Sequence, residues 1–403
     1  MSHIDELIAQ HCPDGVRHVA LSEVAEYSPT RIDAVALDGT SFVGVDNLVA
    51  DKGGRTDASY LPNTTRLTAY EPGDILLGNI RPYLKKVWLA TNSGGCSGDV
   101  LAIRIKPEIQ ESLASEFLYY LLSSDDFFAY NMQHAKGAKM PRGSKAAILN
   151  YVIPVPPLEV QRAIVEVLDT FSKLEAELEA ELEARKQQYE HYSDELLSVE
   201  QEIPRVRFGD VATIVRGASP RPIQRFLTEA HDGVPWIKIG DVPADGKYIT
   251  ETKQHVTPDG AAKSRRVEPG DFVLSNSMSF GRPYITKIEG YIHDGWLAIS
   301  GFEESYVSDY LYYLLRSKPV QDEFKRRAGA GTVQNLNAEI VRSVEIPLPP
   351  RATQERIVNL LDKFDALVND LSVGLPAELT ARRQQYEYYR DKLLAFKALE
   401  VAA

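Results

Sequence analysis

The sequence contains very little cysteine and no long apolar run. Only two of its 403 residues are cysteines, Cys12 and Cys96, and they lie far apart without metal-type spacing. This excludes a disulfide framework and favours a reducing compartment. No stretch approaches the roughly 18 apolar residues that a membrane span requires. Residues 1–6 have neither a basic nor an apolar leader segment. We therefore expect a cytoplasmic protein without membrane contact.

The motifs of common catalytic centres are missing as well. There is no Gly-x-x-x-x-Gly-Lys phosphate loop, no His-Glu-x-x-His pair and no Gly-x-Ser-x-Gly turn. The Pro-Pro pairs at 156–157 and 349–350 lack the preceding Asn or Asp and the following aromatic residue of an amino-methyltransferase. We expect no catalytic residue and no metal site.

The charge is unevenly distributed. The net charge of −12 argues at first against a nucleic-acid partner. Between Glu159 and Glu200, however, 12 acidic and 4 basic residues give a net of −8. Two thirds of the excess therefore belongs to one segment, and the remaining chain is nearly balanced.

The sequence is duplicated. Ile153-Pro-Val-Pro-Pro157 returns 193 residues later as Ile346-Pro-Leu-Pro-Pro350. Further matches, in the same order in both copies, include the Glu-Pro-Gly-Asp, Leu-Tyr-Tyr-Leu-Leu and Gln-Gln-Tyr-Glu segments. A unit of about 195 residues is far longer than a solenoid repeat, so it indicates a duplicated domain. The segment 5–8 resembles 194–197 and 391–394, which predicts either a circularly permuted start lying near the C-terminal helix or a chance match.

Each copy ends in a long helical pattern. Apolar residues recur at three- and four-residue steps from Glu159 to Glu200 and again over about 351–397, where Pro376 should break or kink the helix. A helix of about 42 residues needs a partner, and the copy is the obvious one, in an antiparallel pair. The expected packing residues are Ile164, Leu168, Phe171, Leu178, Leu182, Tyr189, Ile357, Leu361, Phe364, Leu371 and Leu393. The glutamates at 175–183 form either a solvated face or a docking surface.

The regions 13–155 and 203–348 have an α/β pattern. Short β-branched runs such as 74–77, 87–89 and 271–274 are bounded by Gly, Asn and Asp. One helix is expected in each region, around Ser115–Phe128 and Ser308–Phe324.

Positive charge is concentrated in loops at matching positions of the two copies. Such cations suit contact with a phosphate backbone, and Arg, Asn and Gln also read base edges. Any solvated loop carries lysine, so the recurrence in both copies is the stronger indication. The predicted DNA-binding residues are Arg81, Lys85, Lys86, Lys136, Lys139, Arg142 and Lys145 in the first copy, and Arg282, Lys325, Arg326, Arg327, Gln334 and Asn335 in the second.

These features together resemble the specificity subunits of type I restriction–modification systems. The similarity covers nearly the whole chain and lies in Pro13-Asp-Gly-Val16, Gly73-Asp-Ile-Leu-Leu77, Ile80-Arg-Pro-Tyr83, Cys96-Ser-Gly-Asp99 and the Ile-Pro-x-Pro-Pro segments before the long helices. The second copy lacks a clean Pro-Asp-Gly-Val start. The resemblance implies two α/β (α+β) target-recognition domains separated by two antiparallel coiled-coil helices with pseudo-two-fold symmetry. The corresponding boundaries are 1–155, 156–202, 203–348 and 349–403.

The resemblance also implies a non-catalytic role. Each domain would read one half of a bipartite asymmetric site in double-stranded DNA, and the helices would set the spacer. The helices would also bind two modification (methyltransferase) subunits, which carry S-adenosylmethionine, while this chain binds no cofactor. Restriction and motor subunits are further candidate partners. A coiled-coil adaptor would explain the helices but not the paired basic loops, and a stand-alone restriction enzyme would need catalytic motifs.

Overall fold

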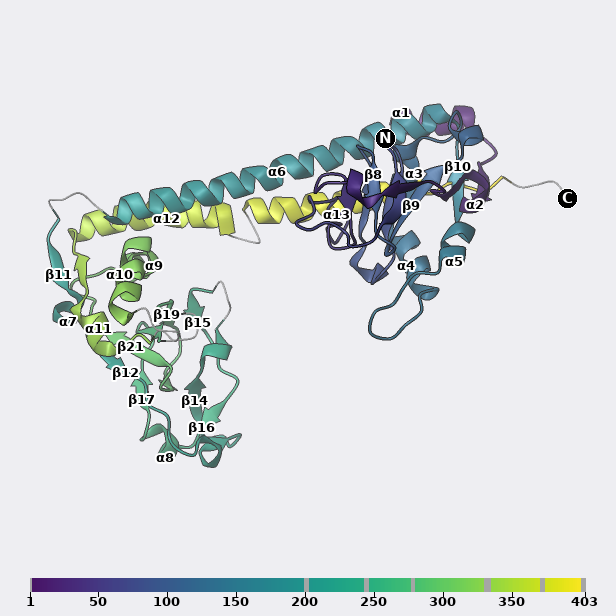
Figure 1. Ribbon diagram of the computed structural model, residues 1–403. Coiled ribbons are helices and arrows are strands. Elements are labelled where there is room, and N and C mark those ends of the chain that lie inside the picture. The colour runs from purple at the N-terminus through teal and green to yellow at the C-terminus, as the bar shows by residue number, and fades with distance from the viewer. Residues whose placement is uncertain are drawn as a thin grey trace. The chain divides into compact units, whose positions relative to one another are not determined.

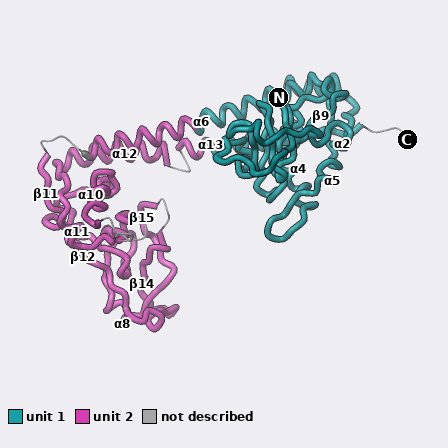
Figure 2. Tube along the Cα trace, viewed as in Figure 1, with its two compact units in different colours: residues 1–179, 379–403 teal, residues 180–378 magenta. Residues whose placement is uncertain are grey.

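The chain divides into two compact units in a computed structural model. Unit 1 comprises residues 1–179 and 379–403, and unit 2 comprises residues 180–378 (Figure 2). The structure describes residues 2–198, 203–242, 246–276, 280–329, 335–369 and 374–399. Both long helical segments continue across the boundary between the units. The unit boundary therefore falls within helices, whereas the sequence placed the domain boundaries at the helix ends.

The described strands of unit 1 form two four-stranded sheets and one two-stranded sheet (Figure 1). The first sheet has the order β2-β9-β6-β7, the second β3-β5-β8-β4, and β1 pairs with β10. The strands are β1 (Arg17–Ala20), β2 (Ala25–Tyr27), β3 (Arg31–Asp33), β4 (Phe42–Val43), β5 (Arg66–Tyr70), β6 (Ile75–Gly78), β7 (Val87–Leu89), β8 (Gly94–Cys96), β9 (Val100–Ile105) and β10 (Val152–Val155).

Unit 2 repeats this topology in its described residues. The order β12-β21-β18-β19 corresponds to β2-β9-β6-β7 and is extended by β15, while β17-β20-β14 corresponds to β5-β8-β4. The strands are β11 (Arg205–Arg207), β12 (Thr213–Arg216), β13 (Leu227–Thr228), β14 (Val234–Ile237), β15 (Tyr248–Ile249), β16 (His255–Val256), β17 (Arg265–Val267), β18 (Phe272–Ser275), β19 (Pro283–Thr286), β20 (Gly290–Ile292), β21 (Trp296–Ser300) and β22 (Glu345–Pro347).

Helices cover the first sheet of each unit. The expectation of a single helix over 115–128 and over 308–324 was wrong, because each is a pair of helices that breaks at Ser123–Ser124 or at Ser317. Ser124 caps the second helix of the pair in unit 1 by accepting a hydrogen bond from the amide of Phe127 (3.2 Å). The helices are α3 (Ser115–Leu122), α4 (Asp125–Gln133) and α5 (Lys145–Asn150) in unit 1, and α9 (Ser308–Arg316), α10 (Lys318–Ala328) and α11 (Ala338–Ser343) in unit 2; the shorter α2 (Leu21–Val24), α7 (Phe208–Val211) and α8 (Pro258–Ala261) complete the set.

The two long helical segments begin directly after the proline-rich segments, as predicted. The first is α6 (Leu158–Ser198), and the second consists of α12 (Arg351–Asn369) and α13 (Leu375–Leu394), which carries Pro376 in its first turn. Proline lacks an amide donor and fits only at a helix start, so the expected break is present. In unit 1 Phe171 contacts Tyr386 and Tyr389, and in unit 2 Tyr192 stacks on Phe364. Since Glu175 contacts Arg383, three residues before Tyr386, the helices of unit 1 run antiparallel.

The residues predicted to pack between the helices differ in burial. Five of them are partly exposed: Phe171, Leu178, Leu182, Tyr189 and Phe364. Leu371 lies outside the described residues. The residues that join the cores beneath the sheets are almost fully buried: Ile164, Leu168, Ile357, Leu361 and Leu393. The apolar residues of the long helices are thus part of the domain core where a helix packs on its domain. Elsewhere they form a partly exposed contact between two helices.

A buried glutamine joins each long helix to its own domain. Gln161, fully buried on α6, accepts a hydrogen bond from the amide of Ala114 (2.9 Å) and donates to the carbonyls of Ser112 (2.8 Å) and Pro156 (2.7 Å). Gln354 makes the same three bonds to residues that lie 193 positions after these. The glutamine side chain therefore supplies hydrogen-bond partners to backbone amide and carbonyl groups that would otherwise be buried without them.

A tyrosine–aspartate bond follows the glutamine in both copies. The hydroxyl of Tyr120 donates to Asp169 (2.5 Å), and that of Tyr313 donates to Asp362 (2.6 Å). Each pair joins α3 or α9 to the long helix that follows it in the sequence. The duplication therefore preserves the hydrogen bonds that hold the two parts together, as well as the fold.

The two ends of the chain meet within unit 1. The amide of Val16 donates to the carbonyl of Lys397 (2.8 Å), and the amide of Leu399 donates to the carbonyl of Val16 (2.9 Å). Helix α1 (Ser2–His11) adds Ile4 and Leu7 to the same core as Leu393. The N-terminal segment thus pairs with residues just after the C-terminal helix and shares a core with Leu393 of that helix, in agreement with the permuted match.

Candidate nucleic-acid interface

Two basic loops of unit 1, far apart in sequence, are hydrogen-bonded to each other. Ile80 pairs with Arg142, the amide of Arg81 donates to the carbonyl of Pro141 (2.7 Å), and the amide of Gly143 donates to that of Asn79 (3.0 Å). The loop after β6 and the loop before α5 therefore form one continuous edge. The sequence identified both loops by their charge, and the structure brings them together.

The same edge is built in unit 2. The amide of Leu336 donates to the carbonyl of Asn276 (2.8 Å), which is the counterpart of the bond between Gly143 and Asn79. Asn79 and Asn276 are both buried, and their amides bind the loop before the next strand at Asp99 (2.8 Å) and Gly295 (3.1 Å). In each unit three loops thus meet at one edge: the loop after β6 or β18, the loop before β9 or β21, and the loop before α5 or α11.

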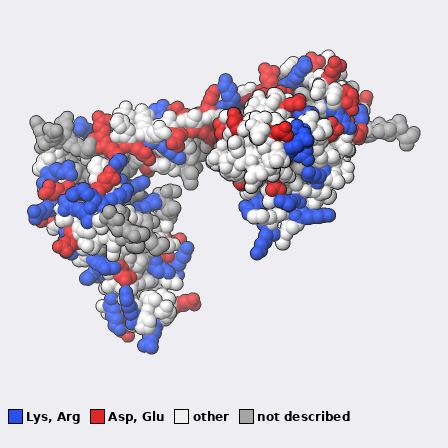
Figure 3. All heavy atoms as spheres, viewed as in Figure 1, with Lys and Arg blue, Asp and Glu red and all other residues white. Residues whose placement is uncertain are grey.

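Exposed cations of unit 1 lie on the loop between α4 and α5. Lys136 and Lys139 are exposed on this loop, which extends from the rest of unit 1, and blue side chains gather there (Figures 1 and 3). Arg142 is also exposed but forms an ion pair with Asp99 (2.9 Å). Lys145 begins α5 and lies over the ring of Tyr27 (5.8 Å to the centroid).

The remaining predicted cations of unit 1 have partners within the domain or a constrained backbone. The Lys85 ammonium binds Asp125 (2.6 Å), and the Lys86 ammonium donates to the carbonyl of Val45 (2.7 Å). Arg81 and Lys85 both adopt left-handed backbone conformations, with φ of 53° and 49°. Such conformations are rare for residues other than glycine, so this loop is held in one particular shape.

Two of the four cations predicted in unit 2 share one carboxylate. The guanidinium groups of Arg326 and Arg327 both contact Glu323, each at 2.6 Å. Their hydrogen bonds lower the pKa of Glu323 to about 2. Lys325 is exposed on the same helix, α10.

The other predicted residues of unit 2 lie at or near the shared edge. Asn335 is exposed beside the bond between Leu336 and Asn276, and Gln334 lies outside the described residues. The Arg282 guanidinium lies over the ring of Tyr284 (5.5 Å to the centroid).

A polar cluster at the edge of unit 2 was missed from the sequence. Asp294 accepts hydrogen bonds from Ser219 (2.7 Å) and Arg221 (3.2 Å), and its carbonyl accepts from Arg216 (3.1 Å) and from the side chain of Asn276 (2.9 Å). These bonds from Ser219 and Arg221 contribute to a lowered pKa of the Asp294 carboxyl. The signal was weak, because Arg216 and Arg221 approach Asp294 from more than 70 positions away in the sequence.

The edge is suited to binding. It carries exposed cations, amide side chains and backbone amides, the groups that contact phosphates and base edges. In the part of the chain that the structure describes, no group of His, Cys, Asp or Glu is arranged to hold a metal ion. Nor does any described helix have the length and apolar character to cross a membrane.

Comparison with known proteins gives a consistent result. Residues 64–184 and 201–381 match the family described as "Type I restriction modification DNA specificity domain". A putative type I restriction enzyme specificity subunit of Haemophilus influenzae is 31% identical over 306 residues, which cover 71% of this chain and 74% of that protein. The EcoR124I/EcoR124II specificity subunit of Escherichia coli is 31% identical over 62% of this chain and 63% of its own length.

Solved structures share the fold. A chain from a structure of a type I R-M system superposes with a TM-score of 0.70 at 23% identity and covers 95% of this chain and 98% of that one. The HsdS subunit from Thermoanaerobacter tengcongensis superposes with a TM-score of 0.53 at 22% identity, over 95% and 97% of the two chains. With the matched sequence and the duplicated loop edge, these findings establish that the chain belongs to the type I restriction–modification DNA specificity family, the DNA-recognition subunits of these systems.

Proposed function

We propose that this chain reads a bipartite, asymmetric site in double-stranded DNA, one half with each recognition domain. The observation that carries the proposal is the repeated edge, in which the scaffold is constant and the side chains differ. The bonds from Gly143 to Asn79 and from Leu336 to Asn276 are equivalent. The first edge presents exposed Lys136 and Lys139, whereas the described part of the second edge presents Asp294 with its arginine partners. One scaffold with two different surfaces suits two different half-sites.

The long helices are proposed to set the spacer and to dock two modification subunits. Those subunits would carry S-adenosylmethionine and perform the methylation, with restriction and motor subunits as further partners. The chain itself would bind no cofactor and catalyse nothing, which agrees with a sequence that lacks methyltransferase and phosphate-loop motifs. The purified chain alone should neither methylate nor cleave DNA, while addition of its modification subunits should produce methylation.

Methylome sequencing tests the proposal directly. Host genomes with and without the gene should differ by one bipartite methylated motif, present only when the gene is intact. An adaptor that binds only proteins predicts no sequence motif that depends on this chain. DNA recognition would be refuted if loss of the gene left methylation unchanged, or if the methylation that was lost followed no common sequence motif.

A further inference from the structure

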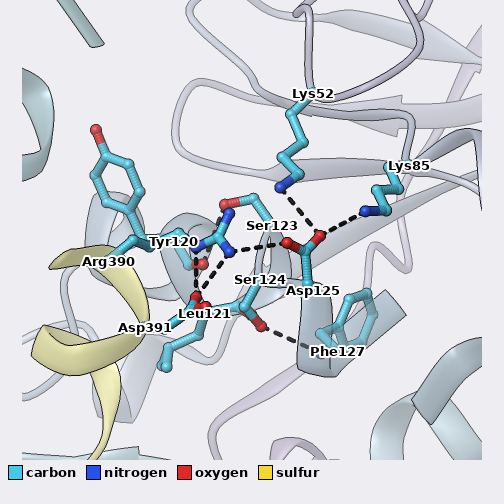
Figure 4. Close-up of polar contacts among 10 residues, drawn as sticks. All are labelled: Lys52, Lys85, Tyr120, Leu121, Ser123, Ser124, Asp125, Phe127, Arg390 and Asp391. Atoms are coloured by element: carbon cyan, nitrogen blue, oxygen red, sulfur yellow. Dashed lines mark hydrogen bonds and ion pairs between the residues drawn. The ribbon is translucent and has the colours of Figure 1, made fainter. Parts of the chain in front are cut away.

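Asp125 is the centre of an ion-pair cluster behind the loop edge of unit 1. One carboxylate oxygen contacts the ammonium groups of Lys85 (2.6 Å) and Lys52 (3.2 Å), and the other contacts the Arg390 guanidinium (3.0 Å) (Figure 4). Asp125 is the first residue of α4, and Arg390 lies in the last turns of α13. The cluster therefore joins the recognition domain to the end of the C-terminal helix.

Arg390 is held by carboxylates on both sides. It is fully buried, and its guanidinium also binds Asp391 (2.7 Å). A buried guanidinium is stable only when its charge is compensated, so removal of either acid leaves Arg390 with a single carboxylate in the interior. Although burial of Asp125 acts to raise its pKa, the bonds from Lys85 and Arg390 hold this pKa well below its usual range. The carboxylate is thus charged at neutral pH, as the cluster requires.

The cluster continues into the loop that carries the predicted DNA contacts. Lys52 and Lys85 have φ values of 65° and 49°, and the amide of Lys52 donates to the carbonyl of Lys85 (2.9 Å). The loop 81–86 is bonded in turn to Pro141 through the amide of Arg81. A left-handed backbone persists only where its surroundings hold it. A continuous series of contacts therefore leads from α13 through Asp125 to the loop edge.

The second copy has different residues at the corresponding junction between the recognition domain and the long helix. Lys318 stands where Asp125 stands in unit 1, and Ser193 stands where Arg390 does. Asp194, the counterpart of Asp391, accepts a hydrogen bond from the amide of Lys318 (2.9 Å) at the start of α10. In unit 2 the start of α10 is thus bonded directly to Asp194 of the long helix. In unit 1 Arg390 lies between the two elements and binds Asp125, which also binds Lys52 and Lys85.

We propose that Asp125 and Arg390 are positioning residues that set the specificity of the first recognition domain. They fix its loop 81–86 against α13, and Lys85 serves this purpose rather than contacting a DNA phosphate. This inference rests on the proposed function. Its consequence is selective: a weakened cluster should relax recognition of one half-site and leave the other unchanged.

The first test separates the two roles of a lysine by salt dependence. Lys85→Ala and Lys139→Ala are compared in the full-length chain assembled with its modification subunits on DNA of the methylated motif. Loss of a phosphate contact lowers the slope of log K against log salt by about 0.9. We expect this decrease for Lys139→Ala, and for Lys85→Ala an unchanged slope with relaxed base discrimination. A slope that falls equally in both variants would show that Lys85 contacts phosphate and would overturn the assignment.

The second test measures the two half-sites separately. Methylomes are compared for the wild type, Asp125→Asn, Arg390→Met and Arg390→Lys, with Asp194→Asn as the matched change at the other junction. Asp125→Asn and Arg390→Met should raise methylation of sites with one mismatch in a single half by about tenfold, the effect of one lost charge-assisted contact. Arg390→Lys, which keeps the charge, should restore part of the stringency, and Asp194→Asn should relax the opposite half.

Equal relaxation of both halves, or unchanged stringency in all variants, would overturn the positioning role. If a cluster variant gives no methylation, the salt experiment with Lys85→Ala still tests the proposal, because Lys85 is partly exposed. If the wild type produced no bipartite motif, the proposed function itself would fail. The two failures are therefore distinguishable.

Discussion

Removing the two exposed lysines of the α4–α5 loop should make DNA binding measurably less sensitive to salt. Lys136 and Lys139 are exposed on a loop that extends from unit 1. Each phosphate contact contributes a slope of about 0.9, so Lys136→Ala with Lys139→Ala should lower the slope by about 1.8. Over a fourfold rise in salt, from roughly 50 to 200 mM, the wild type should lose about 12-fold more affinity than the variant.

Arg142 is expected to contribute less than either lysine. Its guanidinium is already paired with Asp99 at 2.9 Å, so DNA binding exchanges one partner for another rather than releasing a full counterion. Adding Arg142→Ala to the double variant should therefore lower the slope by clearly less than about 0.9. Lys173→Ala is the control, because Lys173 is 78% exposed on the acidic face of α6, beside Glu177.

Fluorescence anisotropy of labelled duplex at several salt concentrations measures these slopes. The assembled complex on its own methylated motif and on unrelated duplex should give the same change, because phosphate contacts carry no sequence information. An unaltered slope in the double variant, or a change as large for Lys173→Ala, would show that this loop does not lie on DNA.

Four further predictions follow from the same structure. Gln161→Ala should destabilise unit 1 by about 3 kcal/mol, the effect of leaving several buried backbone groups unpaired, and hydrogen exchange should rise in unit 1 only; Gln354→Ala should do the same in unit 2, and equal exchange in both units would contradict this. Glu323→Gln releases two arginines of α10 and should tighten DNA binding while steepening its salt slope, so weaker binding would refute the assignment. Deletion of residues 178–181 removes one Leu-Glu-Ala-Glu repeat and shortens α6 by about 6 Å, so the DNA spacer should shrink by about 1–2 base pairs with both half-sites intact; a changed half-site would exclude a ruler. Because the pKa of Asp125 is lowered in the folded state, its stabilising contribution should be present above the unfolded pKa of about 3.9 and decrease as pH falls below it, and Asp125→Asn should remove that part of the acid-unfolding curve.

Repetition made the architecture predictable from the sequence. The matched Gln161 and Gln354 occupy identical hydrogen-bonded positions, and the helix starts follow the proline-rich segments directly. The prediction of a single helix in each domain was wrong because the two helices of each pair both have an apolar, helical sequence pattern. The break at Ser124 depends on a cap whose signal is one hydroxyl. Local pattern thus identified the elements but not the interruption.

The candidate interface was predictable only in part. Charge and repetition located the basic loops, and hydrogen bonds between them agree with a shared surface. The partners of the cations were not visible, because Lys85 meets Asp125 forty positions away and Asp125 meets Arg390 from 265 positions away. The contact of Arg327 with Glu323 has helical spacing and was open to detection. Tertiary pairing therefore decided which charges remain available.

The paired glutamine and tyrosine–aspartate contacts have a consequence for how such genes change. In each copy two of these bonds join residues 49 positions apart, which in unit 1 are Ser112 with Gln161 and Tyr120 with Asp169. Both copies use the same residue types at these positions. Recombination that replaces the sequence before Ser112 would leave every side chain of this junction in place. Two of the three loops that form the edge would then be exchanged on a junction that already fits, and the base-reading surface would change in a single genetic exchange.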